Sequence, residues 1–223
     1  MSSEISILCL TAVSLGVIHT LLGPDHYLPF VAMSRAGGWT ARKTLGVTVG
    51  CGLGHVAGSV GIGSAGLAVG IAVMQLETLE SFRGDVAAWL LIGCGLAYMT
   101  WGMMRAVRGV PHRHVHVPAA ADNAASVASV SVWAPWLAFL VFVFGPCEPL
   151  IPLLMYPAAK ANAGAVAAVV AAFTVATVGT MAIAVLAMRY GLSFVHVPPL
   201  GRFSHALAGL AILMCGVLVK SGL

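Results

Sequence analysis

Two histidines and an aspartate lie close together near the end of the first apolar stretch of the chain. His19 precedes Asp25 and His26, and Gly23 and Pro24 stand between them. Ionisable groups are costly inside a membrane and are usually retained there for a function. The Gly-Pro pair predicts a break in the helix, because proline cannot donate a hydrogen bond to the preceding turn. Imidazole nitrogens with a carboxylate suit nickel, cobalt or zinc better than magnesium or calcium, so these residues predict half of a transition-metal site.

A second Gly-Pro step follows 122 residues later. Under this shift Gly145, Pro146, Cys147 and Glu148 align with the segment Gly23–His26. The second step offers a thiol and a carboxylate, which are both potential metal ligands. We therefore predict a second broken helix at this position, with Cys147 and Glu148 as further candidate ligands.

The remaining candidate ligands are histidines outside the two breaks. His55 lies in the middle of the second apolar stretch and is predicted either as a metal ligand or as a residue that orients one. The glycines around it are also explained by close helix packing alone. His112, His114 and His116 open the segment 112–131 and have the composition of a metal-binding tract. They are either a secondary capture site on the cytoplasmic side or incidental histidines in a solvated loop.

The composition is that of a membrane protein with several spans. Hydrophobic residues make up 60% of the 223 positions, charged residues make up 8%, and the mean hydropathy is +0.98. This balance excludes a water-soluble fold. The basic residues gather in loops rather than on one face, which excludes nucleic acid as a partner. The six apolar stretches predicted to span the membrane are 5–23, 44–73, 86–104, 133–157, 163–188 and 201–219.

The charges between these stretches predict the orientation of the chain. Most Lys and Arg residues follow the first, third and fifth stretches, whereas Glu80 and Arg83 fall in the predicted loop before the third stretch. The positive-inside rule then places the segment 112–131 in the cytoplasm and both termini outside. Cysteines without a CxxC pair give no indication of a disulfide framework.

The two Gly-Pro steps indicate an internal repeat. Residues 1–111 and 132–223 each contain three predicted spans, and 112–131 forms a flexible cytoplasmic loop between them. Because three is an odd number, the second half must enter the membrane from the opposite side. Inverted repeats with broken helices at corresponding positions are typical of transporters that bind their substrate near the membrane midplane. The predicted fold is an all-α membrane protein of six transmembrane helices, arranged as two inverted three-helix repeats with broken first helices.

The first motif resembles a known family. The string from His19 to Asp25 and His26 is similar to the signature of the nickel/cobalt permeases, most closely the type associated with hydrogenase and urease gene clusters. His19, Gly23, Asp25 and His26 match that signature, whereas Thr20 stands where a proline usually follows the first histidine. The resemblance implies that His19, Asp25 and His26 are essential for metal recognition. The histidine-bearing loop is similar to that of the nickel/cobalt efflux branch.

The second motif resembles a different family. The segment Gly145–Pro152 is similar to the Pro-Cys-x-x-Pro-x-x-Pro break of membrane thiol–disulfide electron carriers, which belong to the same broad lysine-exporter-like superfamily as the nickel permeases. A carrier of that kind needs one cysteine in each broken helix. Asp25 occupies the position equivalent to Cys147, so the resemblance supports the fold and argues against the redox activity.

We therefore expect a transporter, not an enzyme, that carries nickel or cobalt through a site at the paired helix breaks. It is expected to hold no permanent cofactor and to reside in a prokaryotic inner membrane. Its expected partners are the lipid bilayer, the divalent metal ion, a metallochaperone or metalloenzyme maturation protein, and a second copy of the chain. Two alternatives remain open: an electron carrier that uses Cys147 with Cys51 or Cys9, and an exporter of a small anion held at half-helix N-termini.

Overall fold

The structure, a computed structural model, contains helices joined by turns and short irregular segments in its described residues. These are residues 3–69, 73–108, 140–142, 145, 147, 149–159, 162–191 and 202–222. The helices are α1 (Ser3–Leu22), η1 (Pro24–His26), α2 (Leu28–Ala36), α3 (Ala41–Val69), α4 (Val73–Val107), α6 (Leu150–Ala159), α7 (Ala163–Gly191) and α8 (Ser204–Lys220). Residues 140–142 are also helical. Within these ranges there is no strand, which confirms the all-α prediction.

Four of the helices are long and apolar enough to cross a membrane. They are α1, α3, α4 and α7, and the 17-residue α8 is a shorter apolar helix. At about 1.5 Å per residue, even the 20 residues of α1 match a hydrocarbon core of about 30 Å. These helices indicate a membrane-embedded protein with several spans. The arrangement of six spans stays a prediction.

One predicted helix boundary is wrong. The third stretch was expected to begin near residue 86, but α4 begins at Val73, so Glu80 and Arg83 lie inside the helix and not in a loop. Both side chains are buried, and they form an ion pair with each other. Hydropathy alone excludes such charges from a span, although a buried charge is tolerated when it is paired.

Both Gly-Pro steps interrupt helices as predicted. α1 ends where the Gly23 N–H donates to the His19 carbonyl, and Pro24 begins the short 3-10 turn η1 because its missing N–H is not needed at a helix start. In the second half the Gly145 N–H donates to the Phe142 carbonyl. Pro146 lies outside the described residues.

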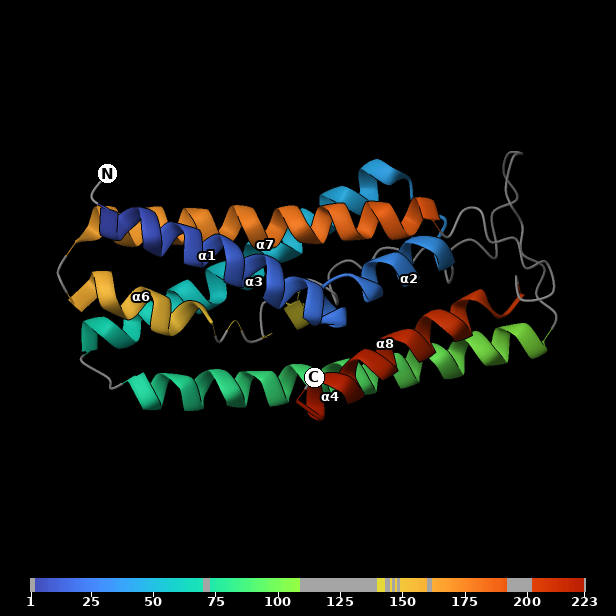
Figure 1. The fold of residues 1–223 in the computed structure, drawn as a ribbon. Coiled ribbons are helices and arrows are strands. Elements are labelled where there is room, and N and C mark those ends of the chain that lie inside the picture. The colour runs from blue at the N-terminus through green and yellow to red at the C-terminus, as the bar shows by residue number, and fades with distance from the viewer. Residues whose placement is uncertain are drawn as a thin grey trace, which may run out of the picture.

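The helices that follow the two breaks keep the spacing of the sequence repeat. α2 and α6 begin 122 residues apart (150 − 28), and α3 and α7 both begin and end 122 residues apart (163 − 41 and 191 − 69). Figure 1 shows α2 and α6 at opposite ends of the molecule, and the chain runs through them in opposite directions. α1 packs on α7, and α7 in turn packs on α3.

A buried polar cluster joins α2 to its neighbours. The hydroxyl groups of Ser34 on α2 and Thr44 on α3 are 2.8 Å apart, and the Arg189 guanidinium on α7 donates to the Ser34 hydroxyl. These bonds hold the far end of α2 against α3 and α7. The C-terminal end of α2 is therefore anchored at this polar cluster.

Glycines let α4 and α8 pack with their backbones in contact (Figure 1). A Cβ added to Gly95 would lie 2.4 Å from a backbone nitrogen of α8, and one added to Gly209 would lie 2.2 Å from a backbone nitrogen of α4. Gly102 and Gly216 make similar approaches, seven residues after Gly95 and Gly209 respectively (102 − 95 and 216 − 209). Seven residues make about two helical turns, so each pair lies on one helix face.

The Gly95→Ala variant is expected to be destabilised by about 1–3 kcal/mol, because its methyl group forces the two backbones apart. Gly93→Ala is the matched control on the same helix, since nothing lies within 4 Å of a Cβ at Gly93. Thermal unfolding in detergent should show a lower midpoint for the first variant only. Equal midpoints for the two variants would contradict the close contact between α4 and α8.

Candidate metal centre

Three histidines from separate segments meet in the interior of the protein. His19 lies in the last turn of α1, His26 ends η1, and His55 lies within α3. The ring centroid of His26 is 4.7 Å from that of His19 and 5.1 Å from that of His55. One ring nitrogen of each histidine lies within 4.8 Å of one on each of the others. We call these three residues the histidine cluster.

The helix break makes this cluster possible. In a continuous helix His19 and His26 would be separated by about 10 Å along the axis, because seven residues rise 1.5 Å each. The turn at Gly23 and Pro24 folds the chain so that the two rings make an edge-to-face contact instead. His55 then approaches from α3 and completes the cluster.

Hydrogen bonds orient two of the three rings. The Nδ1 atom of His55 lies 3.2 Å from the Phe142 carbonyl, and the Nδ1 atom of His26 lies 3.2 Å from the Gly23 carbonyl. A carbonyl oxygen only accepts hydrogen bonds, so each Nδ1 carries the proton. In a neutral imidazole the Nε2 atom then keeps a free lone pair.

The free nitrogens of the cluster lack partners within the protein. The Nε2 atoms of His19, His26 and His55 are all buried, and none of them has a hydrogen-bond partner among the described residues. Leaving one buried polar atom unsatisfied costs about 1–3 kcal/mol. Three such atoms in one place therefore indicate a site for a ligand that accepts lone pairs.

The donor set fits a first-row transition metal. Three neutral imidazoles suit zinc, copper, iron or nickel, whereas magnesium and calcium prefer oxygen ligands. Three nitrogens at about 2.1 Å from one zinc-sized ion cannot all lie more than about 3.6 Å apart. The nitrogen atoms of the cluster are within 4.8 Å of one another, so an inward movement of each nitrogen by under about 1 Å brings all three to bonding distance.

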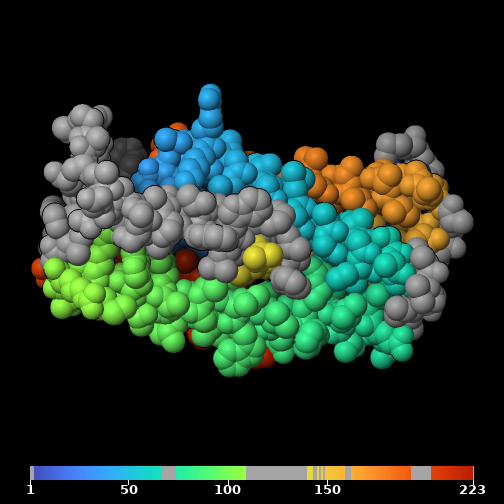
Figure 2. All heavy atoms as spheres, turned by 180° about the vertical axis from the view of Figure 1, so that it is seen from behind, coloured from blue at the N-terminus to red at the C-terminus, as the bar shows by residue number. Residues whose placement is uncertain are grey.

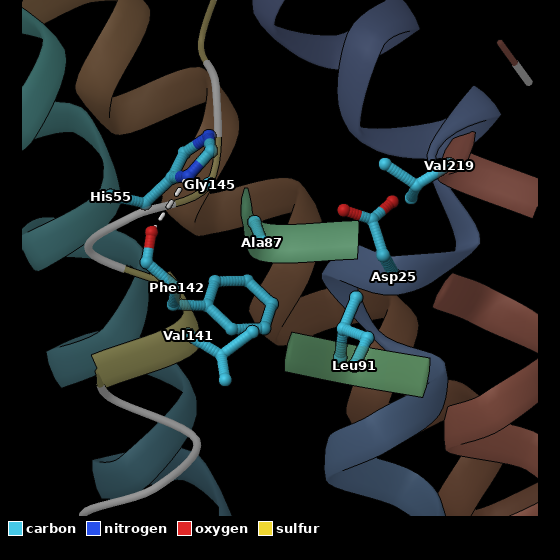
Figure 3. A pocket seen from close by; sticks show the side chains of 8 residues that line it. All are labelled: Asp25, His55, Ala87, Leu91, Val141, Phe142, Gly145 and Val219. Carbon is cyan, nitrogen blue, oxygen red and sulfur yellow. Dashed lines mark hydrogen bonds between the residues drawn. The ribbon is translucent and has the colours of Figure 1, made fainter. Parts of the chain in front are cut away.

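Asp25 lies beside the histidine cluster but is not among the residues whose ligand atoms converge there. Its Oδ1 atom accepts a hydrogen bond from the Nδ1 atom of His26 over 3.2 Å. A carboxylate in this position fixes the orientation and raises the basicity of a metal-binding imidazole. Figure 3 shows Asp25 and His55 on opposite sides of a small cavity. Its other lining residues are Ala87, Leu91, Val141, Phe142, Gly145 and Val219.

The second helix break reaches the cluster through its backbone. A Cβ added to Gly145 would lie 3.1 Å from the Nδ1 atom of His55, and the Phe142 carbonyl accepts from that same atom. The Phe142 ring also makes edge contacts with His26 and His55. The two breaks thus meet at the cluster: the first supplies histidine side chains, and the second supplies main-chain atoms and the Phe142 ring.

The candidate ligands of the second break are placed differently from those of the first. Cys147 is fully buried in an apolar cluster with Leu150 and Phe173, outside the group of ligand atoms formed by the histidines. Its backbone N–H donates to Glu80 instead. Glu148 lies outside the described residues, as do His112, His114 and His116, so their roles stay predictions.

The buried pair of Glu80 and Arg83 was not predicted from the sequence to have a functional role. Both residues bond to Ser59 on α3, and both also bond to the backbone of the second break. The available signal was the presence of two opposite charges three residues apart next to an apolar stretch. Its use requires that α4 begin at Val73, 13 residues (86 − 73) before the boundary that hydropathy suggests, which is between three and four helical turns.

No family model matches the chain, and no curated protein and no solved structure matches it either.

Proposed function

We propose that this protein is a membrane carrier for a divalent transition-metal ion, with nickel or cobalt as the cargo. The observation that carries the proposal is the convergence of three buried imidazole nitrogens that have no partner among the described residues. One ring nitrogen of each histidine lies within 4.8 Å of one on each of the others. A metal ion is the ligand that satisfies all three at once.

The resemblance of the first motif to the nickel/cobalt permeases supports the same cargo. The matching residues His19, Gly23, Asp25 and His26 all belong to the segment that builds the cluster. His19 and His26 act as ligands in this proposal. Asp25 orients His26 and contributes a negative charge beside the dication, which lowers the cost of holding that charge away from water.

The placement of the cluster supports transport over a purely structural metal site. The proposed architecture is six spans in two inverted repeats, and the equal spacing of α2 with α6 and of α3 with α7 agrees with it. Broken helices that face each other across a substrate site are typical of carriers with alternating access. In this arrangement α2 and α6 are the half-helices that open the cluster toward one side or the other.

The proposal includes a prokaryotic inner membrane as the location, both termini outside, and the segment 112–131 in the cytoplasm. The ion is cargo, so no permanently bound cofactor is involved. His112, His114 and His116 then exchange metal with a cytoplasmic metallochaperone or a metalloenzyme maturation protein. A second copy of the chain remains a further proposed partner.

Purified protein in liposomes tests this function. A metal-sensitive dye trapped inside should report saturable entry of nickel and cobalt above the rate of protein-free liposomes. Bound cobalt should show the visible absorption of a site with nitrogen ligands. The proposal would be refuted if nickel, cobalt and zinc all failed to enter the liposomes and bound cobalt showed no such absorption. A reversible internal disulfide in thiol-trapping experiments would favour the electron-carrier alternative instead.

The Asp25→Asn variant should bind metal about 10- to 100-fold more weakly than wild type, the usual cost of losing a carboxylate behind a histidine ligand. Asp85→Asn is the matched control, because Asp85 forms an exposed ion pair with Lys220 on the same protein. Titration of both variants with cobalt gives the two affinities. Equal affinities would show that Asp25 has no influence on the cluster.

A further inference from the structure

Glu80 and Arg83 on α4 connect α3 to the second helix break through a network of buried polar contacts. Arg83 and Glu80 form an ion pair, and Arg83 Nη1 also donates to the Ser59 hydroxyl over 3.2 Å. The Ser59 hydroxyl in turn donates to Glu80 Oε2 over 3.1 Å. Glu80 is fully buried and Arg83 is 7% exposed, so water contributes little to satisfying these charges.

The same two side chains also bond to the main chain of the second helix break, Arg83 as a donor and Glu80 as an acceptor. Arg83 Nη2 donates to the Gly145 carbonyl over 3.3 Å, and Glu80 Oε2 accepts from the Cys147 N–H over 3.2 Å. The cation therefore faces an acceptor, and the anion faces a donor. Figure 2 shows a small yellow patch of the described residues 140–142, 145 and 147 at the surface beside α4, whereas Phe142 and Cys147 of this segment are buried.

This network lies next to the histidine cluster. Ser59 follows His55 by one helical turn on α3, and Gly145 is the residue whose added Cβ would lie 3.1 Å from His55 Nδ1. The Phe142 carbonyl that orients His55 comes three residues before Gly145. A shift of the break away from α4 would remove this carbonyl from His55.

We propose that Glu80 and Arg83 are positioning residues that clamp the second helix break against α3 and thereby hold His55 in its metal-binding orientation. This inference rests on the proposed function, because it concerns a ligand of the proposed metal site. Neither charged group contacts the ion. They act on it through the Gly145 and Cys147 backbone, the Phe142 carbonyl and the His55 ring.

The polarity of the clamp separates this role from simple ion pairing. Exchanging the two charges, as Glu80→Arg with Arg83→Glu, preserves an ion pair within α4. It also places donors at position 80 toward the Cys147 N–H and acceptors at position 83 toward the Gly145 carbonyl. The exchanged pair therefore repels the break that the original pair binds.

The test uses full-length protein in detergent and measures cobalt affinity, the absorption of bound cobalt and the thermal midpoint. The conservative variants Arg83→Lys and Glu80→Gln should each lose about 10- to 100-fold in affinity, the range expected when support behind a ligand is lost. A lysine keeps the charge but lacks the planar fork by which the two terminal nitrogens of Arg83 bond to Ser59 and to the Gly145 carbonyl. The bound cobalt in these variants should show a changed absorption, because His55 is displaced. The exchanged double variant should not recover affinity.

The controls distinguish the two proposals. Asp85→Asn, which removes an exposed carboxylate from the same helix, should bind cobalt as wild type does. Recovery of wild-type affinity in the exchanged variant, or an unchanged cobalt spectrum and affinity in both conservative variants, would overturn the clamp while leaving the metal site in place. A wild-type protein that binds no metal would overturn the proposed function and the clamp together.

Discussion

Replacing His55 with alanine should lower metal affinity by more than about 100-fold, beyond the range seen when only a supporting residue is lost. His55 supplies one of the three converging nitrogens, and its ring is already oriented by the Phe142 carbonyl. Its loss leaves only His19 and His26, both next to the first helix break. Transport should fall with binding, since the ion no longer has a complete site.

Thr177→Ala is the matched control for this variant. Thr177 lies 122 residues after His55 (177 − 55), is likewise fully buried, and has a hydroxyl group without a partner among the described residues. It packs against Gly16 of α1 rather than within the histidine cluster. Isothermal titration with nickel should therefore give a large loss for the histidine variant and little change for the threonine variant. Equal effects would mean that the metal does not bind at the cluster.

Replacing Gly23 with alanine should remove most metal binding while leaving the fold intact. A Cβ at this position would lie 2.5 Å from the Nδ1 atom of His26 and 2.9 Å from Asp25 Oδ1. The backbone at Gly23 has φ −89° and ψ 95°, which alanine adopts without strain. The methyl group therefore acts on the two side chains and not on the chain conformation.

The control for Gly23→Ala is Gly50→Ala on α3, where nothing lies within 4 Å of an added Cβ. Cobalt absorption should be lost or strongly changed in the first variant and retained in the second. The two thermal midpoints should remain similar, because neither change disturbs an apolar contact. Wild-type cobalt binding by Gly23→Ala would show that His26 does not need its present position.

The positions of the helix breaks could be predicted from the sequence because they depend on local chemistry. Proline removes a donor wherever it occurs, so Gly23 and Pro24 identify the end of α1 without any knowledge of its neighbours. The equal spacing of α2 and α6 follows from the same signal in the second half. His19 and His26 could be named as candidate ligands for this reason, since both flank the first break.

The role of each residue at the second break depends on its neighbours and could not be predicted in this way. Cys147 was named for its thiol, but the structure uses its backbone N–H, which every residue other than proline possesses. A hydropathy profile places Glu80 and Arg83 in a loop, because it sums the hydropathy of individual residues and takes no account of their contacts. Their burial depends on Ser59 and on the break, which lie far away in the sequence.

The glycine contacts between α4 and α8 have a consequence for how the molecule can deform. Packed helices usually slide past each other by small adjustments of the side chains between them. Where backbone meets backbone at Gly95 and Gly209, there are no such side chains to adjust, so shear along this interface is blocked. If the proposed carrier changes its shape during transport, we therefore expect rotation at the two helix breaks and the least displacement at α4 and α8.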